Sequence, residues 1–144
     1  MLHNIQASIK EHLEANTGLP CLWIYDGVTL PDTRPILTIE ALSTTYGTRT
    51  KLREAVAVSY RYQIGVICKS SSQAAQLPYA IADLFTFSPV PMLDTANGGA
   101  TIGEIDAKVT AVTPIPYDQA DSPQKHKAYI DVIIARYRVN NGAF

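Results

Sequence analysis

Residues 55–68 read AVAVSYRYQIGVIC, and apolar or aromatic side chains recur at every second position along the segment. One side carries Val56, Val58, Tyr60, Tyr62, Ile64, Val66 and Cys68. A period of two over more than a dozen residues predicts a β-strand with one buried face. We therefore interpret Cys68 as a small core residue, and Tyr60 and Tyr62 as core or rim residues. Strands are usually about five or six residues long, so we expect one end to project beyond the core or to pair with another chain.

The segments before this strand predict one helix and two strands. Apolar residues recur at steps of three and four over residues 2–16, which is typical of an amphipathic helix. The positions that form this stripe are Leu2, Ile5, Ile9 and Leu13. Gly18 and Pro20 end the helix. Strands are then expected from Cys21 to Tyr25 and from Ile36 to Leu42.

A polar, basic segment, residues 43–53 (STTYGTRTKLR), joins the second of these strands to the long one. It contains Arg49, Lys51 and Arg53. A connection between two strands lies at the surface, so we expect an exposed hairpin tip or loop. We predict that these three residues contact a neighbouring subunit or another partner, and an ordinary solvated loop is the alternative.

After the long strand, residues 70–72 are serines that can cap a helix. Residues 74–85 carry a helical apolar stripe, and Pro78 either kinks that helix or marks its first turn. Residues 88–91 (SPVP) end it. The irregular alternation of residues 101–115 predicts one strand.

The last predicted strand runs from Ala128 to Val139 and is rich in β-branched and aromatic residues. A polar loop, residues 116–126, precedes it. The resulting order predicts a single α+β domain over residues 1–144. It would contain an antiparallel or mixed sheet of about four to five strands, with two helices packed on one face.

The composition argues against a protein that binds nucleic acid tightly. Twelve basic residues face thirteen acidic ones, giving a formal net charge of −1. Proteins that bind DNA through its phosphates usually carry a clear basic excess. Charged residues make up 17% of the chain, below the roughly 25% typical of soluble domains. Part of the surface is then covered by partners, or the chain is simply a small domain with many loops.

The charges are also sorted along the chain. Residues 44–70 hold five basic side chains and one acidic, whereas residues 83–121 hold one basic and six acidic. Such blocks can place opposite charges on faces that meet between copies, with ordinary surface patterning as the alternative. If the copies form a ring, we expect the acidic segment or uncharged residues to line its lumen.

The sequence offers no targeting or membrane signal. The first residues, MLHNIQASIKEHLEAN, lack the apolar run of a signal peptide. No window approaches the roughly 18 apolar residues of a membrane span. A cytoplasmic origin and no membrane partner are expected.

No motif for catalysis, a cofactor or a metal is present. The sequence lacks GxGxxG, Walker A, HExxH and GxSxG patterns. Gly98-Gly99 is predicted to be a turn rather than a phosphate cradle. Cys21 and Cys68 are too few and too far apart for a structural zinc site.

The remaining polar candidates have ordinary explanations. We expect each of the three histidines to be solvated: His3, His12 and His126. Asp118 and Asp121 lie in a proline-containing loop, where turn-forming aspartates are common. Glu104 and Asp106 share one face of a predicted strand and need no function if that face is exposed. We therefore expect no catalytic residue, no cofactor and no metal, and hence not an enzyme.

Taken together, the chain resembles the tail terminator and tail-completion (head–tail joining) proteins of long-tailed bacteriophages. The resemblance covers nearly the whole chain. It rests on length, element order, the alternating strand of residues 54–69, the helix opened by Ser71-Ser72, and the final strand that ends at Arg136-Tyr137-Arg138.

The resemblance implies a structural virion protein, made in the host cytoplasm, that closes into a homo-oligomeric hexameric ring. The ring would cap the tail tube, stop its growth and join the tube protein to the head-connector protein. DNA would pass through without tight binding. No individual functional residue is carried over from the family.

Two other classes remain open from the sequence. One is a different phage neck, head-completion or baseplate component. The other is a small α+β enzyme whose active site is assembled from scattered residues.

Overall fold

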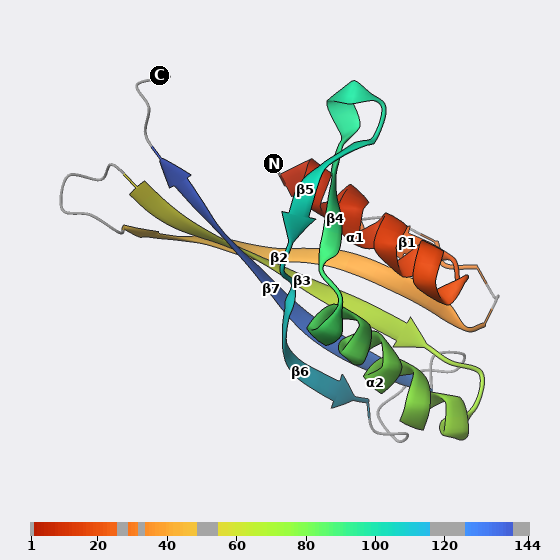
Figure 1. Cartoon of the computed structure of the whole chain (residues 1–144). Helices are drawn as coiled ribbons and strands as arrows, with labels where there is room; N and C mark the ends of the chain where they lie inside the picture. The colour runs from red at the N-terminus through yellow and green to blue at the C-terminus, as the bar shows by residue number, and fades with distance from the viewer. Residues whose placement is uncertain (1, 26–28, 32–33, 49–54, 116–125, 140–144) are drawn as a thin grey trace.

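The structure is a computed structural model, and it describes residues 2–25, 29–31, 34–48, 55–115 and 126–139. Two helices, a five-stranded mixed sheet and a separate two-stranded sheet form a single small α+β unit (Figure 1). Both helices lie on the same side of the large sheet. The predicted fold class is therefore confirmed. Within the described residues, neither helix is long and apolar enough to cross a membrane.

The large sheet has the strand order β1-β2-β3-β7-β6. Its strands are β1 (Cys21–Trp23), β2 (Ile36–Thr48), β3 (Ala55–Ile67), β6 (Lys108–Pro114) and β7 (Lys127–Val139). β1 pairs parallel with β2, and the other three pairings are antiparallel. The long alternating segment is thus the central strand of the sheet, as its pattern predicts.

β3 buries the face that its sequence periodicity marks. Tyr62 and Ile64 are fully buried, and Tyr60 is only 5% exposed. Cys68, just after the strand, is buried as well, so its assignment to the core is confirmed. From Ala128 to Ile134, every second residue of β7 faces the same side of the sheet as the buried residues of β3 and is also buried. These residues are Ala128, Ile130, Val132 and Ile134. These two strands supply much of the core beneath the helices.

The first helix, α1 (Leu2–Thr17), packs against β1, β2 and the small sheet. Ile5, Ile9 and Leu13 are fully buried, which confirms the predicted stripe. Ser8 lies on the same face. Its hydroxyl donates to Asn4 O at 2.6 Å and accepts from Leu93 N at 2.8 Å. A buried polar group that both donates and accepts is well satisfied, so Ser8 joins the helix to the small sheet.

The second helix, α2 (Ser71–Phe87), covers β3, β6 and β7. Ser70 is its N-cap, and the Ser70 hydroxyl accepts from Gln73 N at 3.2 Å. The helix begins three residues before Ala74, so Pro78 lies inside it rather than in its first turn. Pro78 is buried, and its ring adds to the apolar contact with the sheet.

Two predicted boundaries are wrong. β2 continues through Thr48, so residues 43–48, predicted as part of a connection, form a strand paired with β3. The single strand predicted over residues 101–115 is two strands in different sheets: β5 (Ala100–Ile105) in the small sheet and β6 in the large one. The chain crosses from one sheet to the other at residues 105–107. Ile105 and Ala107 are buried there, and Asp106 between them is exposed.

The small sheet was not anticipated. β4 (Val90–Asp94) pairs antiparallel with β5, and the short helix η1 (Thr95–Asn97) precedes their turn. Gly98 and Gly99 have φ values of 74° and 81°. This left-handed backbone suits glycine and confirms that the pair is a turn. Val90 and Met92 are buried, so β4 packs its inner side under α1.

Candidate functional site

The most distinctive feature is a three-stranded extension, which we call the distal ribbon. It consists of residues 44–48 of β2, 56–60 of β3 and 134–138 of β7, which lie side by side in register. Figure 1 shows the ends of these strands extending beyond both helices. Thr45, Gly47 and Ala135 are exposed, and Tyr46 is 67% exposed. A large aromatic side chain exposed at a strand edge is suited to protein contact.

Neither neighbouring strand reaches the distal ribbon. β1 pairs only with Leu37–Ile39 of β2. β6 pairs with β7 no farther than Ile133. Within the described residues, both outer edges of the ribbon therefore lack a strand partner. Backbone N–H and C=O groups along such edges can pair with another strand.

The basic connection follows the β2 part of this ribbon directly in the sequence. Arg49, Lys51 and Arg53, our candidate interface residues, fall outside the described residues. The strands on either side of them pair antiparallel as far as Thr48 and Val56. The segment therefore joins two neighbouring strands, as expected, and its contacts remain a prediction.

The sheet face opposite the helices carries a row of polar side chains that sequence reasoning missed. Glu40, Gln63 and Asp131 are register neighbours across β2, β3 and β7. Gln63 Nε2 lies 3.5 Å from Asp131 Oδ1. Arg61, exposed, is two residues from Gln63 on the same side of β3. Positive and negative groups are interspersed, so the row is suited to polar protein contact rather than to phosphate binding.

At one end of this face an aromatic ring covers a glycine. Gly65 pairs with Thr38 on one side and with Tyr129 on the other. An added Cβ at Gly65 would lie 3.5 Å from Tyr129 Cε1. Lys127 Nζ lies 4.7 Å from the centroid of the same ring, within the range of a cation–π contact. These contacts account for the half-buried Tyr129 without a ligand.

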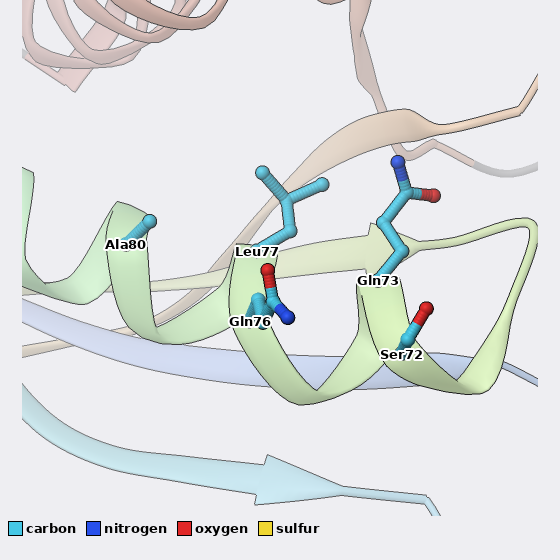
Figure 2. Close-up of a pocket in the computed structure, with 5 residues that line it drawn as sticks. All are labelled: Ser72, Gln73, Gln76, Leu77 and Ala80. Atoms are coloured by element: carbon cyan, nitrogen blue, oxygen red, sulfur yellow. The ribbon is translucent and has the colours of Figure 1, made fainter.

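A shallow hollow of about 440 Å³ lies along the side of α2 from which Gln73, Leu77 and Ala80 project (Figure 2). Its lining is Ser72, Gln73, Gln76, Leu77 and Ala80. None of these side chains titrates near neutral pH. Gln73 is already engaged, because its Oε1 accepts from Lys69 N at 3.0 Å beside the helix cap. The hollow therefore supplies no acid, base or activated nucleophile.

The histidines differ from one another. His3 is exposed and stacks against Trp23, with ring centroids 6.0 Å apart. His126 is half-buried, and its carbonyl accepts from Cys68 N at 2.7 Å.

For His12 the expectation of a solvated ring is wrong, because the residue is only 9% exposed and packs near Phe85. Burial lowers the pKa of His12. The sequence held a signal for this position, since residues 5, 8, 9, 12 and 13 form one helical face. Counting only apolar residues left out Ser8 and His12.

The cysteines and carboxylates form no site in the described part of the chain. Burial raises the pKa of Cys21 to about 12, with Glu14 contributing, and burial raises that of Cys68 to about 11. Both thiols are thus protonated and unreactive near neutral pH. Glu104 and Asp106 are exposed, and Asp118 and Asp121 lie outside the described residues. Among the described residues, no three histidine, cysteine, aspartate or glutamate side chains are grouped to hold a metal ion.

Comparison of the chain with protein-family models gives no match, and comparison with curated proteins gives none either.

Proposed function

We propose that the protein is a structural component that works by assembling with copies of itself, specifically a ring-forming tail terminator of a long-tailed phage. The distal ribbon carries this proposal. Three strands of thirteen residues each are longer than a domain of this size needs for its own core. At their ends, two strand edges that have no partner among the described residues, together with the exposed Tyr46 side chain, lie at the surface.

Two features of the surface support an assembling protein. The row of Glu40, Gln63 and Asp131 with the nearby Arg61 mixes charges on one face, and such a face can meet a complementary one on a neighbour. The exposed Tyr46, Tyr79 and Phe87 supply apolar area at separate positions on the surface. The sequence resemblance adds the specific role, in which the ring caps the tail tube and joins it to the head connector.

Mass measurement tests the assembly. Native mass spectrometry and light scattering on purified protein are expected to give a closed homo-oligomer, with six copies implied by the family resemblance. Particle images should show a ring, because a heterologous contact closes when its rotation divides a full turn. A strict monomer, both in isolation and within purified tails, would remove the proposal.

The specific role needs a second measurement. The tube protein encoded by the same genome is polymerised with and without this protein. A terminator is expected to cap the tubes, so added protein should shorten their length distribution and appear at one tube end. Unchanged tube lengths with a ring present would leave an assembling protein but remove the terminator role.

A further inference from the structure

The two outer edges of the distal ribbon lie at the same level of the sheet. Thr45 pairs with Ser59, and Ser59 pairs with Ala135. Two residues farther along, Gly47 pairs with Ala57, and Ala57 pairs with Tyr137. Among the described residues, the open outer edge of β2 therefore lies directly across the ribbon from the open outer edge of β7, over the same five positions.

The β2 edge lacks the features that keep strand edges apart. Natural edge strands are blocked by proline, by charged side chains such as lysine, or by bulges. Residues 43–48 read STTYGT, with no proline and no charge. The bulge in β2 falls between Ala41 and Thr44, before the five-residue stretch, which is itself in regular register. This stretch can therefore accept another strand along its whole length.

We infer that the two edges pair with each other between copies, so that residues 44–48 of β2 in one subunit add a strand to residues 134–138 of β7 in the next. The inference rests on the proposed function for the existence of an assembly and adds which surfaces meet. β2 and β7 run in the same direction because each is antiparallel to β3. A neighbour rotated about an axis along the strands would thus pair in parallel.

A second copy is the occupant that the structure favours, because one chain provides both halves of the contact. The two edges differ, so the contact is heterologous and repeats from copy to copy instead of ending at a dimer, and it forms a ring when its rotation closes. β5 is a competing edge, with Thr101, Ile102 and Glu104 exposed. It is irregular, however, with a register shift opposite Met92 and Leu93 and a Gly103 φ of 149°. Such irregularity disfavours strand addition.

Cysteine cross-linking tests the pairing. Adjacent strands lie about 5 Å apart, which matches the Cα separation of a disulfide. The full chain is made as Thr45→Cys/Ala135→Cys, and as Gly47→Cys/Ala135→Cys to allow for a shift of two residues. Mild oxidation of the assembled protein is expected to give a ladder of covalent multimers on a denaturing gel. Each single variant should remain uncrosslinked, and a mixture of Thr45→Cys and Ala135→Cys chains should stop at dimers.

The controls separate the possible failures. Wild-type protein sets the background of Cys21 and Cys68, and circular dichroism confirms that each variant is folded. Glu104→Cys/Ala135→Cys tests the β5 edge. An intact assembly without a ladder from either ribbon pair, or with a ladder from the β5 pair, would overturn the inference and leave the ring. Dimers from Thr45→Cys alone would indicate a two-fold contact and also overturn it. A monomer would overturn both the inference and the proposed function.

Discussion

Thr38 and Gly65 face each other across the β2–β3 pair so closely that a Cβ at Gly65 would clash with Thr38 Oγ1. Thr38 is 5% exposed, so it has little room to move. We expect Gly65→Ala to lower the free energy of unfolding by about 1–3 kcal/mol, the usual cost of overpacking. Denaturant unfolding followed by circular dichroism measures it.

Two variants check the cause of that loss. Gly47 lies on the same strand pair, and a Cβ there would meet nothing nearer than Ala57 O at 4.0 Å. Gly47→Ala should therefore leave stability unchanged or raise it slightly. Adding Thr38→Ala to Gly65→Ala removes the clashing oxygen and should recover most of the loss. A Gly65→Ala protein as stable as the wild type would contradict the close contact.

Because His12 is buried, we expect the protein to lose stability in mild acid. Its Nδ1 lies 3.3 Å from Asn16 Nδ2, and its buried Nε2 has no hydrogen-bond partner in the described part of the chain. Burial lowers the pKa of His12 below 6.5 in the folded protein. Below about pH 6.5 the unfolded chain therefore binds more protons than the folded one. The free energy of unfolding should then fall as the pH drops, by at most about 1.4 kcal/mol per pH unit for one proton.

Chemical denaturation between pH 7.5 and pH 5 measures this dependence. His12→Leu cannot titrate and should flatten the pH profile, whereas the exposed His3→Gln should preserve it. A wild-type slope retained in His12→Leu would assign the proton to another group.

The thiols are expected to be inert in the native protein. Cys21 and Cys68 have pKa values raised to about 12 and about 11, so little thiolate exists at pH 8. Both are also buried. A chromogenic disulfide reagent should label neither within the time in which it labels both in guanidinium. Fast labelling of the native protein would show that one of these sites opens readily.

The elements that the sequence predicted correctly are those with one buried face, because burial of that face requires apolar residues at regular intervals. β3 alternates because one face is core, and α1 shows its stripe because Ile5, Ile9 and Leu13 are buried. The same reasoning identified Ser70 among the possible caps of α2 and placed β7 correctly.

The missed elements lack such a pattern. Thr45, Tyr46 and Gly47 of β2 are all exposed, so alternation is absent and pairing with β3 holds the strand. β5 is exposed at every residue before Ile105. The polar row on the open face could not be found either, because it depends on the register of three strands far apart in sequence.

The basic connection gives a direct test of assembly. Reversing all three charges, as Arg49→Glu/Lys51→Glu/Arg53→Glu, is expected to impair oligomer formation while the subunit stays folded. Opposite charges at an interface favour association, and like charges oppose it. Light scattering reports the oligomer, and thermal unfolding reports the fold. Lys69→Glu is a control, since this exposed residue of the same basic block lies beyond the opposite end of β3. Normal assembly of the triple variant would indicate a solvated loop.

The protein is also expected to hold duplex DNA only weakly, even if DNA passes through the ring that we propose. The formal net charge is −1, so no overall field attracts phosphate. Among the described residues, the exposed Arg61 shares its face with Glu40 and Asp131, which breaks up any continuous basic track.

There is a physical reason for a ring through which DNA passes to bind that DNA only weakly. Each phosphate neutralised by lysine or arginine releases counterions and adds affinity, and a ring multiplies every cation that faces the lumen by the number of subunits. Many such contacts would slow a genome that must slide. A titration of duplex DNA at about 0.15 M salt, near physiological ionic strength, should therefore show no submicromolar binding. Tight binding that weakens steeply with added salt would contradict this prediction. It would indicate that basic residues such as Arg49, Lys51 and Arg53 contact DNA and that the protein functions in nucleic-acid binding.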